Sequence, residues 1–280
     1  MRMRMLTVAV MAALLAVAGL AGPAHARTTA PRVTAKEVYL IDAATGTPQF
    51  ARRETRRVPV ASLTKIMTAY VVRRSASLDA VVTITKADVR HAAANGAARA
   101  GLKAGERLSV RDLLYALLLP SGADAAGALA RTYGPGVRRF VGKMNAAARS
   151  LGMRDTFYTN PDGMPQPGGD HSTAFDQVTL AKTVLADPIV AQVAGTKRHA
   201  VAKTPLHRGH VWKNTNRLLP DDAQGLKTGY TRPAGYCLMF AAARDGRTYI
   251  GVILGERTDA ARYRTARSLL DAATAAAAAA

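Results

Sequence analysis

The sequence predicts an α+β protein in which an antiparallel sheet is built from both ends of the chain. Two extended segments, 38–46 and 47–54, open the fold, and two more, 235–244 and 247–256, flank an Asp-Gly dipeptide typical of a tight hairpin. The stretch between these ends is mainly helical in its pattern. We therefore expect a sheet flanked by helices, with an all-helical subdomain inserted at about 87–187.

The helices are predicted from apolar periodicity and from capping residues. From Ser62 onward, apolar residues recur at i, i+3, i+4, i+7 and i+8, the spacing of an amphipathic helix. Ser109 and Asp112 form an approximate capping box for a helix that ends at Leu119. Further helices are expected after Gly122 and at about 136–151, 173–187 (stopped before Pro188) and 259–273.

Short strands complete a single domain. Extended segments are expected at 81–85, 197–202, 210–214 and 225–231. The sequence contains no internal repeat and no sign of a second domain, so residues 27–274 are expected to fold together. The alanine tail at 275–280 is expected to fray. A cleft between the sheet and the helical subdomain is a natural place for a ligand.

The first 26 residues have the pattern of a secretory signal peptide. Arg2 and Arg4 give a basic start, an apolar run covers 6–20, and a small-x-small sequence ends at Ala26. A membrane-spanning anchor is the alternative, but the run is short for a span and no stop-transfer pattern follows. We expect an exported protein, secreted or associated with the cell wall, without a C-terminal membrane anchor. The single cysteine, Cys237, is expected to be buried as a small apolar residue.

The chain is strongly basic. It has 39 Lys and Arg against 19 Asp and Glu, and its formal charge of +20 falls to +18 when Arg2 and Arg4 leave with the signal peptide. Export and the scatter of the basic residues argue against nucleic acid as a partner. Anionic wall polymers or phospholipid headgroups suit an exported basic surface, and charges that are simply solvated are the equal alternative. His207 and His210 have no metal-site partners at the usual spacing, so we expect surface positions and no metal.

Ser62 and Lys65 are the first candidates for chemistry. A spacing of three places both side chains on one face of a helix, about one turn apart. A lysine amine can take the proton of a serine hydroxyl when burial or a nearby cation lowers the pKa of the lysine. The start of a helix also directs backbone N–H groups and the positive end of the helix dipole at the serine. One Ser-x-x-Lys alone is weak evidence, because chance produces such pairs.

Two further stretches extend this pattern. Lys227, Thr228 and Gly229 lie in an extended segment, where lysine offers charge to a carboxylate, threonine a hydroxyl, and glycine close approach of a substrate backbone. An ordinary edge strand is the alternative. Ser121 lies in an exposed turn between two helices, which would place its hydroxyl opposite Ser62. A cap for the following helix is its alternative role.

Taken in order, Ser-x-x-Lys, Ser-Gly-x and Lys-Thr-Gly resemble the motifs of penicillin-binding proteins and class A β-lactamases. The segments NPDGMPQPGGDHSTAFD (160–176) and WKNTNRLL (212–219) are similar to serine-type D-alanyl-D-alanine carboxypeptidases, the low-molecular-mass penicillin-binding proteins. The resemblance covers about 35–270 and implies the penicillin-binding/β-lactamase-like fold.

The resemblance also implies a role for each motif residue. Ser62 would attack the carbonyl between two D-alanines of a peptidoglycan stem peptide, with Lys65 as proton acceptor and Ser121 as relay to the leaving amine. Lys227, Thr228 and Gly229 would bind the substrate, and the backbone N–H groups of Ser62 and Tyr230 would form the oxyanion hole. β-Lactams would be covalent inhibitors, and no metal or organic cofactor would be needed.

Ala123 departs from the family pattern, because the second motif usually ends in asparagine. The amide of that asparagine would orient the catalytic lysine. Losing a hydrogen bond to a charged group of this kind costs about 1.5–3 kcal/mol, or roughly 10- to 150-fold in rate if the whole loss applies to the transition state. A catalytically weakened penicillin-binding or wall-binding protein is therefore one alternative, and a transpeptidase is another. A β-lactamase is disfavoured, because the segment NPDGMPQPGG offers no glutamate to activate the deacylating water.

Overall fold

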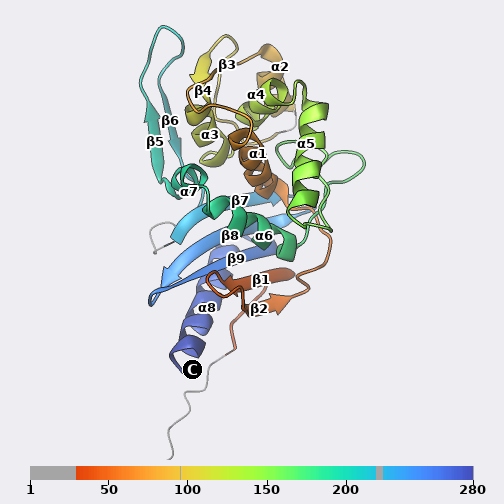
Figure 1. Ribbon diagram of the computed structural model, residues 1–280, viewed down its shortest axis with the longest axis vertical. Helices are drawn as coiled ribbons and strands as arrows, with labels where there is room; N and C mark the ends of the chain where they lie inside the picture. The colour runs from red at the N-terminus through yellow and green to blue at the C-terminus, as the bar shows by residue number, and fades with distance from the viewer. Residues whose placement is uncertain (1–29, 95, 219–222, 280) are drawn as a thin grey trace, which may run out of the picture.

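The computed structural model describes residues 30–279 apart from residue 95 and residues 219–222. Its centre is a five-stranded antiparallel sheet with the strand order β2-β1-β9-β8-β7 (Figure 1). The strands come from both ends of the chain, as the sequence predicts: β1 (Glu37–Asp42), β2 (Pro48–Arg52), β7 (Ala223–Thr231), β8 (Gly235–Arg244) and β9 (Arg247–Glu256). The predicted α+β class is thus confirmed.

The central strands are joined as the sequence patterns indicate. Asp245 and Gly246 both have positive φ angles and connect β8 to β9, the conformation that a tight hairpin requires. The first strand, β1, then pairs antiparallel with β9, so that Val38 lies opposite Ile253. This pairing of distant segments closes the sheet, and it leaves β7 and β2 as its edges.

Helices cover both faces of the sheet. Helix α8 (Asp259–Ala278) packs on one face, where Tyr263 and Leu270 meet apolar residues of β1, β8 and β9. The opposite face is covered by α6 (Ala174–Leu185) together with the short 3-10 turn η1 (Ala61–Leu63). Side chains alternate across a strand, so the central strands direct side chains to both faces. Because helices cover both faces, these side chains are buried in two apolar cores, one on each side of the sheet.

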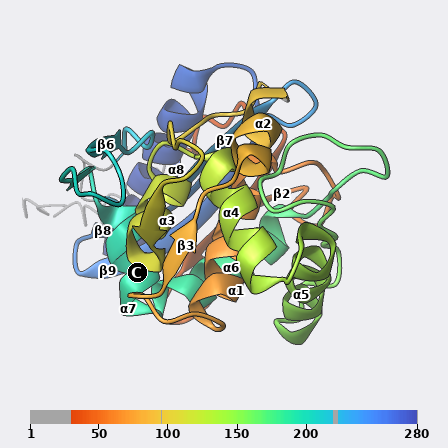
Figure 2. The same cartoon turned by 90° about the horizontal axis from the view of Figure 1, so that it is seen from above.

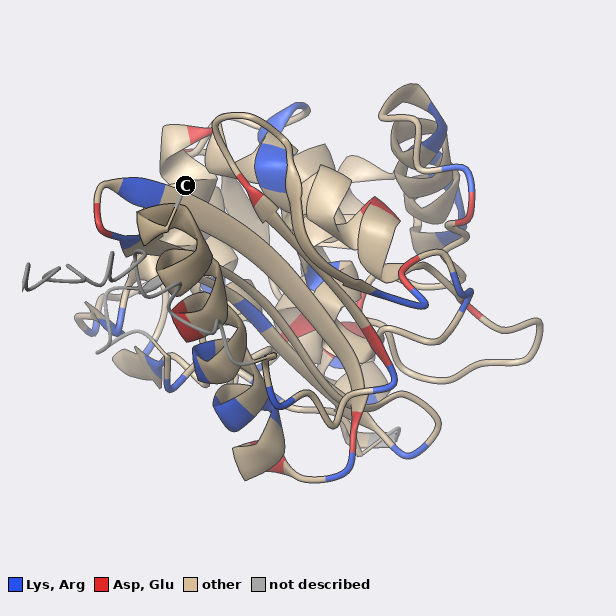
Figure 3. Ribbon diagram, turned by 90° about the horizontal axis from the view of Figure 1, so that it is seen from below, with Lys and Arg blue, Asp and Glu red and all other residues tan. Residues whose placement is uncertain are grey.

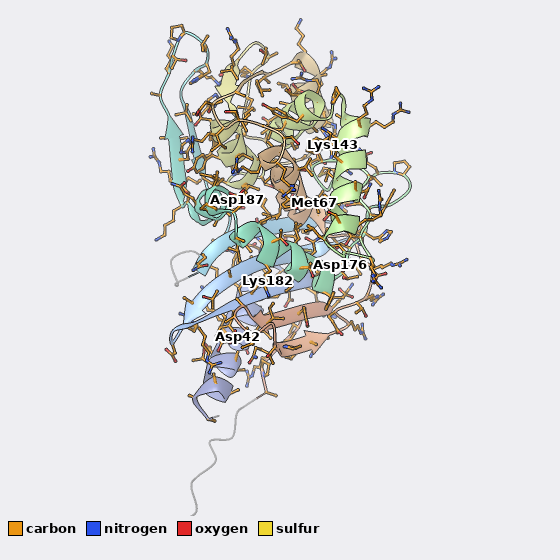
Figure 4. All side chains as sticks on the ribbon, viewed as in Figure 1. Asp42, Met67, Lys143, Asp176, Lys182 and Asp187 are labelled. Carbon is orange, nitrogen blue, oxygen red and sulfur yellow. The ribbon has the colours of Figure 1, made fainter. Side chains whose placement is uncertain are left out.

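The predicted helical region lies beside the sheet and surrounds α1 (Thr64–Arg73) (Figures 1 and 2). It contains α2 (Lys86–Ala94), α3 (Val110–Leu118), α4 (Ala123–Tyr133) and α5 (Val137–Ser150), with the small β3–β4 pair (Val81–Thr83 and Arg107–Ser109) at its edge. Met67 of α1 is fully buried in this interior (Figure 4). The predicted cap of α3 is confirmed, because the Ser109 hydroxyl accepts from the Asp112 N–H at 3.0 Å.

Some elements differ from the sequence expectation. Helix α6 stops before Pro188, as expected, but Pro188 also begins α7 (Pro188–Gly195), with Asp187 as the N-cap, because proline is well suited to the first turn of a helix. Helix α8 continues to Ala278 instead of ending at about 273, since alanine has the highest helix propensity. Cys237 is buried and free, as expected. The predicted signal peptide, 1–26, lies outside the described residues.

The hairpin of β5 (Arg198–Val201) and β6 (His210–Lys213) corrects one expectation. His210 is buried, not on the surface, and its Nε2 lies 3.1 Å from the buried carboxylate of Glu106. Local sequence patterns do not reveal this pair, because 104 residues separate its members.

Across the described ranges, no single helix has the length and apolarity to cross a membrane. The bent pair of α6 and α7 meets those two criteria when its helices are taken together.

Candidate active site

Ser62 and Lys65 lie together where η1 passes into α1. The Lys65 amine is 3.0 Å from the Ser62 hydroxyl and donates to the backbone oxygen of Asp162 at 2.6 Å. Only 1% of Lys65 is exposed. Ala61, directly before the serine, has φ of +51°, so a strained turn presents the hydroxyl at the start of the helix. The structure therefore brings together the predicted nucleophile and proton acceptor.

The buried position of Lys65 tunes its basicity. Burial lowers the pKa of this amine to about 8, although the carboxylates of Asp162 and Asp124 oppose the shift. An amine with this pKa has a neutral fraction near physiological pH that an ordinary lysine lacks, and the neutral form can accept a proton from a hydroxyl group. Asp124 is itself buried. Its carboxylate accepts hydrogen bonds from the backbone N–H groups of Ala100, Gly101, Leu102 and Ala125, which fixes the 100–102 loop beside the site.

The Asn-Pro-Asp-Gly turn holds Lys65 from the other side. The side-chain oxygen of Asn160 accepts the backbone N–H groups of Asp162 and Gly163, which fixes the turn. Gly163 has φ of +76°, and a side chain there would clash with the backbone oxygen of Ala61. The turn therefore fits against the nucleophile segment only with glycine at this position.

Ser121 lies in the turn between α3 and α4 and lines the same cleft as Ser62. It is buried, with 6% exposure, and not exposed as the sequence predicts. The 96–98 segment lies beside the turn, where the Ala98 backbone oxygen accepts a hydrogen bond from the Ala123 N–H, and it lines the same cleft. The N-cap of α4 is Gly122, so the capping role for Ser121 is wrong. Its hydroxyl has no hydrogen-bond partner among the described residues, and its φ is +64°.

Strand β7 forms the opposite wall from an edge of the sheet, as predicted. Lys227 is buried, and the hydroxyl of Thr228 lies 2.6 Å from that of Thr215. A Cβ at Gly229 would come within 3.2 Å of the Ser62 nitrogen and 3.0 Å of the Val60 oxygen, so glycine allows β7 to approach the nucleophile. Tyr230 follows directly and is half exposed at the cleft.

The cleft between these walls has a volume of about 960 Å³. Its lining includes Ser62, Ser121, Thr228 and Tyr230, while Lys65 and Lys227 are buried beneath that lining. The predicted site residues thus converge on one cavity. No group of three or more His, Cys, Asp or Glu side chains in the described part of the chain is placed to hold a metal ion.

Arg262 belongs to this site and was missed from the sequence. Its guanidinium donates to the backbone oxygens of Gly229 and Cys237, both at 3.1 Å, and pairs with Asp259. It reaches the cleft from α8, and burial, followed by the charges of Lys65 and Arg262, lowers the pKa of Lys227 well below its ordinary value. Arg262 lies among other arginines of α8, so no local pattern marks it as a residue of the site.

Ala123 is fully buried at the first turn of α4, and its N–H donates to the backbone oxygen of Ala98 at 2.8 Å. Lys65 is already held by the Ser62 hydroxyl and the Asp162 backbone oxygen. The backbone oxygen of Asp162 thus gives the Lys65 amine a hydrogen-bond acceptor that does not depend on the side chain at position 123.

A serine facing a buried lysine amine, in a cleft bounded by an edge strand, defines a serine-type acyl-transfer enzyme. The chain belongs to the D-alanyl-D-alanine carboxypeptidase family, whose family model matches residues 24–258. It is 39% identical over 280 residues to the D-alanyl-D-alanine carboxypeptidase of Streptomyces sp. (strain K15), covering 95% of this chain and 96% of that protein.

Other relatives agree with this membership. The carboxypeptidase DacF of Bacillus subtilis is 31% identical, and the match covers 88% of this chain but 63% of DacF. The crystal structure of the Streptomyces K15 DD-transpeptidase superposes with a TM-score of 0.83 at 39% identity, over 88% of this chain and 99% of that one. Penicillin-binding protein 6B of Escherichia coli matches with a TM-score of 0.79 at 33% identity, over 87% of this chain and 78% of that one.

Proposed function

We propose that this chain is a penicillin-sensitive serine carboxypeptidase that removes the terminal D-alanine from peptidoglycan stem pentapeptides. The single observation that carries the proposal is the 3.0 Å contact between the Ser62 hydroxyl and the buried Lys65 amine, inside a cleft bordered by β7. Family membership supports the same reaction and substrate. β-Lactams would acylate the same serine and act as covalent inhibitors.

The proposed reaction begins with neutral Lys65. Its amine takes the proton of Ser62 as the serine oxygen attacks the carbonyl between the two D-alanines. The backbone N–H groups of Ser62 and Tyr230 stabilise the developing oxyanion, and Gly229 supports this role by allowing β7 close to Ser62. Ser121, whose hydroxyl is otherwise unpaired among the described residues, relays a proton to the leaving amine.

We assign recognition of the substrate to the β7 wall. The terminal carboxylate of the stem peptide is an anion, Arg262 lines the cleft, and an arriving carboxylate would restore the charged form of the buried Lys227. Thr228 and Gly229 line the cleft beside them and would contact the substrate backbone. Water then resolves the acyl-enzyme and releases the shortened peptide.

Two assays test this function. A fluorescent penicillin is expected to label the wild-type protein and not the Ser62→Ala variant. The wild-type protein is also expected to release D-alanine from a stem-peptide analogue. A folded wild-type protein that neither becomes labelled nor releases D-alanine would show that the proposed function is wrong.

Transpeptidation is the second candidate, since the solved structures of the Streptomyces K15 relative are named for that activity. An amine from a second peptide would then resolve the acyl-enzyme instead of water. Adding an acceptor amine to the D-alanine release assay separates the two outcomes. Hydrolysis predicts the free acid as the main product, whereas transpeptidation predicts the acceptor-linked peptide.

The signal-peptide pattern of residues 1–26 supports the proposal that the protein is cleaved after Ala26 and acts outside the cytoplasm. Contact with anionic wall polymers is a further part of this proposal. Basic segments recur along α8 and the loops of the lower face, interspersed with acidic ones (Figure 3). Cell fractionation tests both points: export predicts a shortened chain outside the membrane, and polymer contact predicts its release by salt.

A further inference from the structure

The backbone turn that holds Lys65 also carries a buried carboxylate. Asp162 is fully buried, and its backbone oxygen accepts from the Lys65 amine. Its side chain turns the other way: Oδ2 lies 2.7 Å from Nε2 of His91, and Oδ1 accepts the Met164 N–H at 3.1 Å. An ionised carboxylate can only accept, so Nε2 of His91 carries the proton and donates. One residue thus links the proposed base to a histidine.

His91 reaches Asp162 from α2, outside the proposed substrate cleft. It lines a second cavity of about 340 Å³, which shares no lining residue with the cleft. The His91 side chain is 30% exposed, while the Asp162 side chain is fully buried. The imidazole can therefore exchange protons with solvent, whereas the carboxylate and Lys65 are shielded from it.

Four charged groups face His91 or its immediate neighbours. Asp162 comes from the turn, Lys65 from α1, Asp88 from the same helix, and Arg131 from α4. Arg131 binds the Asp88 carboxylate at 3.0 Å, so this pair is internally balanced. The remaining groups, Lys65, Asp162 and His91, form a row. A change of charge on His91 shifts the protonation equilibrium of Lys65, and the reverse also holds.

We propose that His91 is a positioning residue for the acyl-transfer reaction: through Asp162 it holds the turn against Lys65, and its protonation state sets the charge that the lysine amine experiences. This inference rests on the proposed function, in which Lys65 is the base. No motif of the sequence contains His91, and 71 residues separate it from Asp162.

The direction of the effect follows from the charges. The hydrogen bond to Asp162 raises the pKa of His91, against the opposing effect of burial. When His91 is protonated, its charge offsets the carboxylate and makes neutral Lys65 easier to form. When His91 loses its proton as the pH rises, the carboxylate acts on Lys65 without that offset and favours the ammonium form. Protonated His91 therefore preserves acylation at low pH.

The test is the pH dependence of Ser62 acylation by a fluorescent penicillin in the wild type and in His91→Gln, which keeps a donor but does not titrate. The ratio of wild-type to variant rate is expected to rise about fivefold from pH 9 to pH 5.5, which corresponds to a change of about 0.7 unit in the pKa of Lys65, since one unit is a tenfold change in its neutral fraction. A ratio that is constant with pH would reduce His91 to a structural residue and overturn the proposal.

His199→Gln is the matched control. His199 also pairs with an aspartate, Asp112, at 2.9 Å, but it belongs to β5 and contacts α3. Its rate ratio to wild type is expected to stay constant over the same pH range. If His199→Gln reproduces the pH-dependent ratio of His91→Gln, the effect does not come from the row beside Lys65 and the proposal fails.

A titration of His91 by NMR tests the same coupling without a substitution at His91. Because coupling is reciprocal, replacing Lys65 by methionine removes a positive charge and is expected to raise the pKa of His91. An unchanged His91 titration would contradict the inference. These results are separable from failure of the proposed function, since that failure appears as a wild-type protein that penicillin does not acylate at any pH.

Discussion

The two buried lysines of the cleft lie in opposite electrostatic surroundings. Lys65, on α1, is near the carboxylates of Asp162 and Asp124, which oppose the effect of burial, so its pKa falls only to about 8. Lys227, on β7, has cations as neighbours, and burial, Lys65 and Arg262 all lower its pKa. Both lysines are buried, but Lys65 can exchange a proton near neutral pH, whereas the cations near Lys227 disfavour its charged form.

This difference assigns the two lysines different tasks. An amine that titrates near neutral pH suits a general base. A desolvated amine beside a second cation is instead poised to gain from an arriving anion, which would restore its charged form. The terminal carboxylate of the proposed substrate is such an anion. The substitutions below test this division of labour in order of expected effect.

Replacing Lys65 by methionine is expected to lower Ser62 acylation by about 10³-fold, because positioned general bases contribute roughly 10²- to 10⁴-fold. The measurement is the rate of labelling by a fluorescent penicillin. Lys182→Met, at an exposed position on α6 (Figure 4), is the matched control and should keep the wild-type rate. A Lys65→Met protein that labels at the wild-type rate would remove Lys65 from the chemistry.

The same Lys65→Met substitution is expected to stabilise the folded protein at pH 7, by up to about 3 kcal/mol, since each pKa unit is worth about 1.4 kcal/mol. The folded-state pKa of Lys65, about 8, lies below its ordinary value of 10.5. The unfolded wild type therefore binds more protons between these values, and wild-type stability rises with pH across that window. Urea unfolding should show the variant's advantage shrinking from pH 7 to pH 10.

Substituting Lys227 by glutamine is expected to reduce turnover of a D-Ala-D-Ala substrate by roughly 10- to 100-fold, the range of a charge-assisted hydrogen bond. A substrate whose terminal carboxylate is replaced by an amide should lose little, because it brings no charge to the β7 wall. Lys213→Gln, at an exposed position on β6, is the control. An equal loss of turnover on both substrates would show that Lys227 does not bind the terminal carboxylate.

The smallest effect is expected at Ala123. Since Lys65 already has the Ser62 hydroxyl and the Asp162 backbone oxygen as partners, Ala123→Asn should change the D-alanine release rate by less than about tenfold. The assay compares wild type and variant under one set of conditions, with thermal unfolding to confirm that the variant is folded. A rise of a hundredfold would mean that the missing asparagine limits the enzyme.

The parts of the molecule that were predictable depend on local signals. The hairpin at Asp245, the cap at Ser109 and the Ser62–Lys65 pair each involve residues that are near in sequence, so spacing and turn chemistry reveal them. The KTG strand, Lys227–Gly229, follows the same rule, and its position at a sheet edge was also foreseen.

The unpredicted parts depend on packing between distant segments. Arg262 reaches Gly229 across 33 residues, and His91 meets Asp162 across 71. A lone arginine on a helix or a lone histidine has no local pattern that separates it from solvated neighbours. The turn position of Ser121 is predictable, but its burial is not, because it is set by tertiary packing around the turn, where the distant 96–98 segment also lies.

The pH dependence of Ser62 acylation in the wild-type protein tests the central claim most directly. If Lys65 is the base, the rate of labelling by a fluorescent penicillin rises with pH and levels off with an apparent pKa of about 8. A rate that stays flat between pH 6 and pH 10, in a protein that remains folded, would contradict the account, because Ser62 would then be activated by a group other than Lys65.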